Sequence, residues 1–417
     1  MKKVLVVDDS PIILSMLKIE IAKYNRMEPY YAKTYKEAFR LLREHKGKFH
    51  AALLDLNLPD VPSGEIVKLA NSHGIPSVVL TSKVDEQVQK SLLKKDVLSV
   101  ILKNDHASIK VAVADISRTL SNYDTTVLIV DDSKLFRQIL RTSLEKIQLN
   151  VLEARDGEEA YNILESSKEK ISLIITDYEM PKRNGLDLTL KIREKYQKDE
   201  LAIIAISAVE TKDIISKFLK FGANDFVNKP FEHTEVVTRV NANLELLDLF
   251  AKIRDMANKD FLTGAYNRRY FFESGEPIYA KNKRKETPMA VAMIDIDKFK
   301  NINDTYGHDI GDIAIQEIKK ILDKNLRTSD LMARFGGEEF CVFLEDITIE
   351  DAKILFEKIR KAFEENVLDA NGTKILYTVS TGIYYGFSIS LDEMIRLSDE
   401  ALYTAKEGGR NRVEIKS

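Results

Sequence analysis

The feature that most constrains the fold of this chain is an internal repeat. The segment KVLVVDDS at residues 3–10 returns as TVLIVDDS at residues 126–133. Three further pairs follow in the same order: LLD at 53–55 with ITD at 175–177, VLTS at 79–82 with AISA at 205–208, and ILK at 101–103 with VNK at 227–229. Matches that keep their order over so long a stretch indicate two copies of one domain.

Both copies alternate short β-branched runs with longer amphipathic segments, a pattern typical of β-α-β units around a parallel sheet that is buried on both faces. We therefore expect two α/β domains of the doubly wound, flavodoxin-like type. In this fold, acids that end the first and third strands lie at the carboxyl edge of the sheet, where the strand order reverses and ligands bind. The sequence thus predicts a polar site at the same edge of each copy.

Composition excludes several classes of function. A chain of 417 residues has room for about three domains. Its formal net charge of −3 gives no basic surface for nucleic acid, and no apolar stretch approaches the roughly 20 residues that span a bilayer. No signal-peptide pattern follows the N-terminus, and the single cysteine, Cys341, lies in an apolar run where a buried strand residue is expected. We expect a cytoplasmic protein without nucleic-acid or membrane partners.

Each copy carries the side chains that aspartyl phosphorylation needs. A carboxylate can accept a phosphoryl group only if a divalent cation offsets the charge on both groups and an ammonium steadies the departing oxygens. The first copy offers Asp8 and Asp9 for the metal, Asp55 as acceptor, Thr81 as hydroxyl and Lys103 as ammonium; the second offers Asp131, Asp132, Asp177, Ser207 and Lys229.

Both sets resemble the receiver domains of response regulators, and the resemblance covers nearly all of residues 1–245. We expect receiver domain 1 at 1–122 and receiver domain 2 at 124–245. The resemblance implies bound Mg²⁺ (or Mn²⁺) and transfer of a phosphoryl group from a sensor histidine kinase or phosphotransfer protein. The structural alternative is that these acids only cap strand ends.

The two receivers differ at the switch positions of the family. In the second, Lys229 precedes Pro230, which favours a cis bond, and Phe226 occupies the place of the aromatic switch residue. In the first, that place is held by Val100. We expect the second receiver to be the better switch, and the first to couple weakly or to act as a dimerisation adaptor.

A long helix is predicted after the second receiver. From residue 235 to 258 the chain has no Gly or Pro, and apolar residues recur at Val240, Leu244, Leu247, Phe250 and Ile253. We expect a signalling helix over 236–259 that continues the last helix of receiver 2. It either pairs with the same helix of a second subunit or packs on its own domain, since two heptads do not establish a coiled coil.

The third domain, expected at 260–417, contains two blocks rich in acidic residues. An apolar strand at 289–294 ends in DID at 295–297, and the segment ARFGGEEFCVFL follows at 333–344. Within the second block, Gly336 and Gly337 predict a two-residue hairpin turn with positive φ at both positions.

Glu338 and Glu339 would then lie at a tight turn with little side-chain bulk around them, where a triphosphate can approach. If the hairpin lies beside the strand that ends at Asp295, the carboxylates converge from separate elements. Such convergence is what one or two Mg²⁺ ions that bridge the phosphates of a nucleotide require.

These blocks resemble the GGDEF family of diguanylate cyclases in its GGEEF form, over residues 260–412. With its two receivers, the whole chain resembles response regulators of the PleD type. The resemblance implies an α+β fold related to nucleotide cyclases and polymerase palms. It also implies that a homodimer, activated by receiver phosphorylation, joins two GTP molecules into cyclic di-GMP and releases two pyrophosphates.

The resemblance also implies roles for individual residues. Asp295, Glu338 and Glu339 would be catalytic, with the metal held by Asp295, Glu338 and the Ile296 carbonyl. Asn303 and Asp312 would bind the guanine, Lys406 and Arg410, four apart on one expected helix face, would hold the triphosphate, and Arg327 and Asp330 would form the RxxD site through which cyclic di-GMP inhibits the family.

Two further classes of function compete with the enzyme. A non-catalytic sensor or scaffold that binds GTP or cyclic di-GMP would not need the intact acids at 295, 338 and 339, so their presence favours catalysis. For Arg327 and Asp330, an ordinary surface ion pair is the alternative to a product site. A DNA-binding regulator is disfavoured because the chain has no basic helix-turn-helix pattern.

Overall fold

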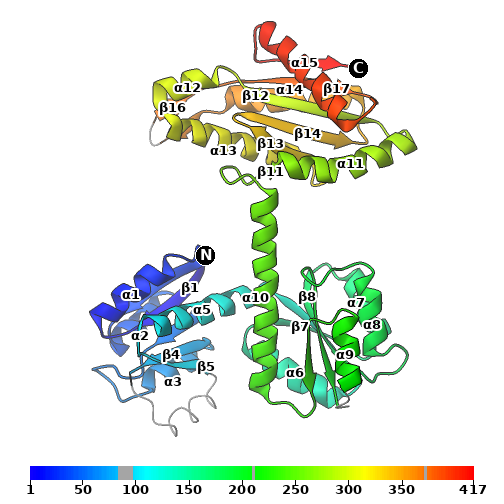
Figure 1. Cartoon of the computed structure of the whole chain (residues 1–417). Coiled ribbons are helices and arrows are strands. Elements are labelled where there is room, and N and C mark those ends of the chain that lie inside the picture. Colours follow the sequence, from blue (N-terminus) through cyan, green and yellow to red (C-terminus); the bar gives the residue numbers. More distant parts are fainter. Residues whose placement is uncertain (83–96, 209–211, 371–372) are drawn as a thin grey trace. The chain divides into compact units, whose positions relative to one another are not determined.

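The computed structural model describes residues 1–82, 97–208, 212–370 and 373–417. These residues form two compact units, Met1–Ala251 and Lys252–Ser417. The first unit holds both copies of the repeat and the second holds the third domain (Figure 1). None of the helices in the described ranges is both long and apolar enough to cross a membrane.

The first repeat is a five-stranded parallel sheet in the order β2-β1-β3-β4-β5. On strand β1, Leu5 and Val7 face one apolar cluster, whereas Val4 and Val6 face the other, so helices cover both sides. Its described elements are β1 (Lys2–Val7), α1 (Pro11–Ile21), β2 (Met27–Ala32), α2 (Tyr35–Glu44), β3 (Ala51–Leu54), α3 (Glu65–Ser72), β4 (Ser77–Thr81), β5 (Val97–Leu102) and α5 (His106–Asn122).

The second repeat has the same topology, with its strands in the order β7-β6-β8-β9-β10 and all pairs parallel. The predicted doubly wound fold is therefore confirmed for both copies. The peptide bond between Lys229 and Pro230 is cis, as expected. The elements are β6 (Thr126–Val130), α6 (Lys134–Lys146), β7 (Asn150–Ala154), α7 (Gly157–Ser166), β8 (Ile171–Asp177), α8 (Gly185–Arg193), β9 (Ala202–Ser207), α9 (Lys212–Lys220) and β10 (Asp225–Asn228).

Helix α10 (His233–Asn258) is continuous, as predicted (Figure 1). Its first half packs on the second repeat, because Val236, Val240 and Leu244 are buried in that core and Leu247 packs against it. Of the two alternatives for this helix, packing on its own domain therefore holds for Val240, Leu244 and Leu247. A helix that turns every 3.6 residues presents a second face, and there Leu246, Leu249, Phe250, Ile253 and Met256 are between 44% and 83% exposed.

The second unit is built on a six-stranded mixed sheet, β11-β13-β14-β12-β17-β18. Central strand β12 is buried along its whole length and pairs antiparallel with both β14 and β17, which confirms the expected α+β fold. Its elements are β11 (Tyr266–Asn267), α11 (Arg268–Lys285), β12 (Met289–Ile296), α12 (Phe299–Tyr306), α13 (His308–Asn325), β13 (Leu331–Gly336), β14 (Glu339–Glu345), α14 (Ile349–Glu365), β15 (Leu368–Ala370), β16 (Thr373–Ile375), β17 (Val379–Tyr385), α15 (Leu391–Glu407) and β18 (Val413–Lys416).

The core of the second unit lies on both faces of this sheet. Ala292 and Ile294 of β12 belong to one apolar cluster, and Val291 and Met293 belong to the other. Cys341 of β14 is fully buried, as predicted, and burial raises the pKa of its thiol well above the ordinary value. A strand buried on both sides is rigid, so the residues that leave its carboxyl end have fixed positions.

Candidate functional site

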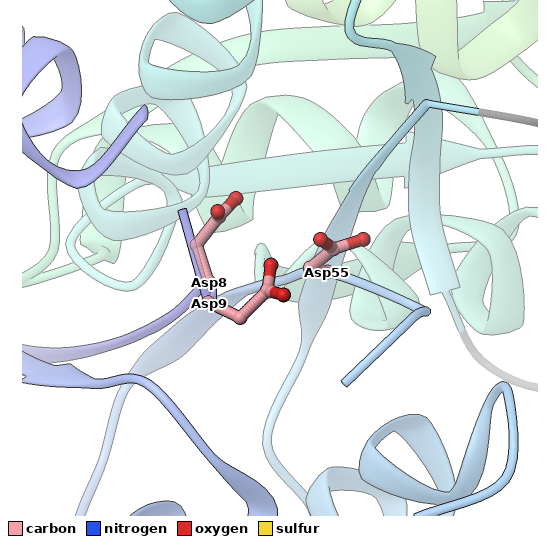
Figure 2. A group of neighbouring side chains, drawn as sticks. All are labelled: Asp8, Asp9 and Asp55. Carbon is pink, nitrogen blue, oxygen red and sulfur yellow. The ribbon is translucent and has the colours of Figure 1, made fainter. Parts of the chain in front are cut away.

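In the first repeat, three carboxylates gather where β1 and β3 end. Ligand oxygens of Asp8, Asp9 and Asp55 all lie within 4.8 Å of one another (Figure 2). The Lys103 ammonium reaches Asp8 Oδ2 and Asp55 Oδ2, each at 2.6 Å. Burial raises the pKa of Asp8, although Lys103 acts against this rise. Three carboxylates against one ammonium leave negative charge that a divalent cation can balance.

The second repeat has the same arrangement. Oxygens of Asp131, Asp132 and Asp177 lie within 4.8 Å of one another, and Lys229 Nζ lies 2.8 Å from Asp131 Oδ2 and 3.1 Å from Asp177 Oδ1. Burial raises the pKa of Asp177. The ammonium also lies 4.2 Å from the centroid of the Phe136 ring, a cation–π contact that the sequence analysis missed.

Backbone hydrogen bonds bring the predicted hydroxyl residues next to the lysines. The Lys103 amide donates to the Thr81 carbonyl, and the Lys229 amide donates to the Ser207 carbonyl, both at 2.8 Å. Thr81 and Ser207 are the last residues of β4 and β9. These strands neighbour β3, which precedes Asp55, and β8, which ends at Asp177. The structure therefore brings each predicted receiver set to one edge of its sheet.

The predicted switch positions differ in packing. Phe226 is buried in a small cluster with Phe218, and the centroids of these two rings are 6.1 Å apart. Val100, at the same place in the first repeat, is only partly buried. An aromatic side chain has far more contact area than valine, so a movement of Phe226 would disturb more of the neighbouring side chains than a movement of Val100.

In the second unit, Asp295 is nearly fully buried in strand β12. Lys406 Nζ lies 2.9 Å from Asp295 Oδ2. Burial raises the pKa of Asp295 to about 6; Lys406 opposes this rise, and the nearby charges of Glu338 and Glu339 add to it. The pKa of Glu339 is also raised, first by burial and then by the charge of Asp399. The three predicted catalytic carboxylates therefore share one electrostatic environment.

The hairpin that carries the glutamates differs from the prediction in one respect. Gly336 pairs with Glu339 as the last residue of β13, so the two turn residues are Gly337 and Glu338. Gly337 has a φ of +49°, whereas Gly336 and Glu338 have no positive φ. The prediction of a positive φ at both glycines is therefore wrong. A glycine followed by a residue of negative φ is the pattern of a type II′ turn, which suits the twist of a hairpin.

The cyclase carboxylates are not gathered as closely as those of the receivers. Among the residues that the structure describes, only the two receiver clusters have three acidic side chains with ligand atoms within 4.8 Å of one another. Glu338 lies in the turn and Glu339 begins β14, while Asp295 is held by Lys406. The receiver acids follow parallel strands that end at one edge of a sheet, whereas these acids come from a strand end and a hairpin turn, so their spacing differs.

The predicted guanine ligands lie on two consecutive helices, Asn303 on α12 and Asp312 on α13. Asn303 Oδ1 is buried and, within the described chain, has no hydrogen-bond partner. It lies against Gly311, where a Cβ atom would come within 2.0 Å of this oxygen. Asp312 is exposed. A buried amide oxygen without a partner is costly, so this position suits contact with a polar ligand.

The two predicted triphosphate ligands do not share a helix face. Lys406 lies in the last turn of α15, but that helix ends at Glu407, and Arg410 has a φ of +66° in the loop that follows. The expected helical pair is therefore wrong, because Gly408 and Gly409 interrupt the helix.

The predicted RxxD residues lie in the loop between α13 and β13. The Arg327 amide donates to Asp330 Oδ2 at 2.7 Å, and burial raises the pKa of Asp330. Both residues line a cavity of about 390 Å³ together with Tyr266 and Lys319. The contact between Arg327 and Asp330 thus involves the backbone of the arginine.

Comparison with known proteins identifies the family. Residues 4–114 and 127–241 match the response regulator receiver domain, and residues 257–412 match the diguanylate cyclase GGDEF domain. The response regulator PleD of Caulobacter vibrioides is 30% identical over 320 residues, which span 72% of this chain and 68% of PleD. This chain belongs to the PleD-type response regulators. Its second unit carries a diguanylate cyclase domain of a family that uses a divalent metal.

Other relatives agree with this family. Diguanylate cyclase A of Treponema denticola is 40% identical over 171 residues, 40% of this chain and 46% of that protein. A crystal structure of a two-component response regulator/GGDEF domain protein superposes with a TM-score of 0.54 at 38% identity, over 60% of this chain and 100% of that one. These partial matches agree with the receiver and GGDEF matches, which together cover both repeats and the cyclase domain.

One arginine that the sequence analysis missed connects the hairpin to the start of the cyclase domain. Arg334 of β13 donates through Nη1 to Asp260 Oδ1 at 2.9 Å and through Nε to the Gly337 carbonyl at 2.8 Å. Asp260 Oδ1 also accepts from the Thr263 hydroxyl at 2.7 Å. The only sequence signal was an arginine two residues before the paired glycines, which does not reveal its distant partner.

The raised pKa of Asp295 leads to a prediction for the metal-free protein. Because the folded pKa is about 6, above that of an unfolded aspartate, protonation stabilises the fold below about pH 4, and this contribution is lost as the pH rises through 6. Asp295→Asn removes the titration. With a chelator present, we expect the unfolding free energy of the variant relative to wild type to rise by as much as about 2 kcal/mol between pH 4 and 7. Calorimetry measures this, and a difference that does not vary with pH would contradict it.

Proposed function

We propose that this chain is a response-regulator diguanylate cyclase that converts two GTP molecules into cyclic di-GMP and two pyrophosphates. In each step, the 3′-hydroxyl of one GTP loses its proton and attacks the α-phosphorus of the other, and pyrophosphate leaves. Two such steps close the ring. The observation that carries this proposal is the buried Asp295 carboxylate, which shares its electrostatic environment with Glu338 and Glu339.

The metal-binding group in this proposal consists of Asp295, Glu338 and the Ile296 carbonyl, with Glu339 beside them. Oxygen ligands of this kind suit Mg²⁺ or Mn²⁺. The cation, when bound, would offset charge on the phosphates and on the leaving pyrophosphate. The raised pKa values of Asp295 and Glu339 support the assignment, because burial, and then neighbouring carboxylates, make their negative charge costly and a bound cation would offset it.

Binding of the nucleotide is assigned to two further groups. Asn303 and Asp312 would contact the guanine, and the partnerless Oδ1 of Asn303 supports this role. Lys406 and Arg410 would hold the triphosphate. Lys406 pairs with Asp295 at 2.9 Å, so we expect its ammonium to turn towards a phosphate oxygen when a cation binds the carboxylate.

A homodimer is needed because each cyclase domain would bind one GTP and two must meet. We propose that the dimer forms through the α10 stripe, defined as Leu246, Leu249, Phe250, Ile253 and Met256. The first, second, fourth and fifth of these follow a three-four-three spacing, which is the a/d pattern of a coiled coil. Each of these four side chains is at least 51% exposed, which supports this role. A second copy of the chain presents the same stripe, so the two stripes can pack against each other.

Control of the cyclase is assigned to the receivers. Asp177 and Asp55 would accept a phosphoryl group from a sensor histidine kinase or phosphotransfer protein, with the metal at Asp131 and Asp132 or at Asp8 and Asp9. We propose receiver domain 1 at 1–122, receiver domain 2 at 124–245, the signalling helix at 236–259 and the cyclase at 260–417. The packing of Phe226 supports the second receiver as the stronger switch.

Feedback by the product is assigned to Arg327 and Asp330. The cavity of about 390 Å³ that they line supports a site for a ligand. An arginine fork matches both a phosphate and a guanine edge, which are the groups that cyclic di-GMP presents.

The central test incubates the full chain with GTP and Mg²⁺, with and without beryllofluoride as a phosphate mimic, and follows cyclic di-GMP by chromatography. We expect product in both conditions and more with the mimic. Binding of GTP or cyclic di-GMP without any turnover would support the sensor alternative and remove the enzyme proposal.

A second test separates the two receivers. Asp177→Asn and Asp55→Asn each remove one phosphoryl acceptor and keep its shape. We expect Asp177→Asn to abolish stimulation by beryllofluoride, and Asp55→Asn to keep most of it, because only the second receiver has an aromatic switch. Equal loss of stimulation in the two variants would contradict this division.

The dimer is tested at the α10 stripe. Leu249→Lys with Ile253→Lys places two charges where apolar side chains, worth about 2 kcal/mol each when buried, would meet a second copy. We expect a monomer in analytical ultracentrifugation and turnover reduced by at least about tenfold. Ala251→Lys, which adds the same charge at the outer position of the heptad, is the matched control and should remain dimeric; a dimer in both variants would refute the stripe.

Gly311 offers a test of the guanine site that does not alter its ligands. Gly311→Ala favours the helix, but its Cβ would come within 2.0 Å of Asn303 Oδ1 and push that side chain aside. We expect a higher KM for GTP, by about tenfold, with an unchanged melting temperature. Gly336→Ala, where nothing lies within 4 Å of the added atom, is the control for stability. An unaltered KM in Gly311→Ala would argue against Asn303 as a ligand.

A further inference from the structure

The loop that carries Arg410 has an unfavourable backbone conformation. Gly409, Arg410 and Asn411 have φ values of +116°, +66° and +45°, so three successive residues are left-handed and two of them are not glycine. Each non-glycine residue in this region costs roughly 1 kcal/mol. Such a conformation persists only where surrounding contacts fix it.

The contact that fixes it comes from Asp297, the acid two residues after Asp295. Asp297 is buried, and its carboxylate accepts three hydrogen bonds. Oδ2 accepts from the Asn411 amide at 2.9 Å and from the Thr378 hydroxyl at 2.7 Å, while Oδ1 accepts from the Ser380 hydroxyl at 2.6 Å. Both oxygens of this carboxylate therefore accept from uncharged protein donors, whereas the Asp295 carboxylate pairs with the Lys406 ammonium.

A second anchor holds the same loop from the other side. Asn411 Oδ1 accepts from Arg360 Nη1, and Asn411 Nδ2 donates to Glu364 Oε1, both at 2.9 Å. Arg360 and Glu364 lie on α14 and are paired with each other at 2.8 Å. The loop is thus fixed between the end of β12 and helix α14.

Between these anchors Arg410 is available to a ligand. Its side chain makes no hydrogen bond or ion pair with any residue in the described part of the chain, and it lines a cavity of about 490 Å³ together with Asp297 and Lys298. The long side chain of Arg410 has large conformational freedom. Because the loop holds the backbone of Arg410 in place, less entropy is lost when this side chain binds a ligand.

We infer that Asp297 is a positioning residue for nucleotide binding: its carboxylate holds the Asn411 amide and thereby fixes the left-handed loop that presents Arg410 to the triphosphate. This inference rests on the proposed function. It assigns different tasks to the two acids of the Asp-Ile-Asp segment. Asp295 would contact the metal and the substrate, whereas Asp297 fixes the loop that carries Arg410 and Asn411.

The test is a double-mutant cycle with Arg410, read out as affinity for a GTP analogue with a methylene between its α and β phosphorus atoms. Asp297→Asn keeps the size of the side chain but cannot accept from all three donors. In the full chain with Mg²⁺, we expect calorimetry to show about tenfold weaker binding for Asp297→Asn and for Arg410→Ala. Because Asp297 is inferred to act only through the position of Arg410, the double variant should bind the analogue no more weakly than Arg410→Ala alone.

Three outcomes would overturn the inference. They are unchanged affinity in Asp297→Asn, unchanged affinity in Arg410→Ala, and losses that multiply in the double variant, as a merely structural role would produce. If wild type itself does not bind the analogue, the proposed function fails together with the inference. If wild type binds and only Asp297→Asn has no effect, the inference alone fails.

Two further variants control for general damage. Ser380→Ala removes the bond to Oδ1 and leaves the oxygen that holds Asn411, so we expect a lower melting temperature with unchanged affinity. Should Asp297→Asn fail to fold, Thr378→Val frees one side of Oδ2 and should weaken binding by about threefold, again without adding to Arg410→Ala. Full affinity in Thr378→Val would then count against the role of Asp297.

Discussion

Negative charge held at the ends of buried strands is the feature on which this structure depends. In three places an aspartate at such an end pairs with a single lysine: Asp8 with Lys103 at 2.6 Å, Asp131 with Lys229 at 2.8 Å, and Asp295 with Lys406 at 2.9 Å. In each place further carboxylates lie nearby, so one ammonium does not neutralise the group. Burial makes such unbalanced charge costly, which is why the pKa values of Asp8, Asp177 and Asp295 are raised.

Two different sheets produce this arrangement. In the receivers, parallel strands end at the same edge, so acids that follow separate strands meet without any special turn. In the cyclase domain, β12 runs antiparallel to β14, and the end of one strand therefore lies beside the start of the other. The two-residue turn at Gly337 brings the glutamates to that place. In the proposed function both arrangements would present carboxylates to a divalent cation and a phosphate. The spacing of the acids differs because the backbones differ.

Helix α10 has two faces with different partners. One face completes the core of receiver 2 through Val236, Val240 and Leu244, and the other carries the exposed α10 stripe. A change in the packing of the receiver core therefore acts directly on the helix that bears the stripe. This gives the proposed control a physical route, since the same helix belongs to the receiver and carries the proposed dimer surface.

The sequence by itself determined the two doubly wound domains, the mixed α+β sheet, the continuous helix and the identity of the acids. These follow from local periodicity and from side-chain chemistry, which a chain carries wherever it folds. Only the tertiary structure decided where side chains meet. It showed that Leu247 packs inward, that the turn begins at Gly337, that Arg410 lies beyond the end of α15 and that Asp297 holds the loop of Asn411. Each of these depends on a contact between elements distant in the chain or on a backbone angle that neighbouring glycines permit but do not dictate.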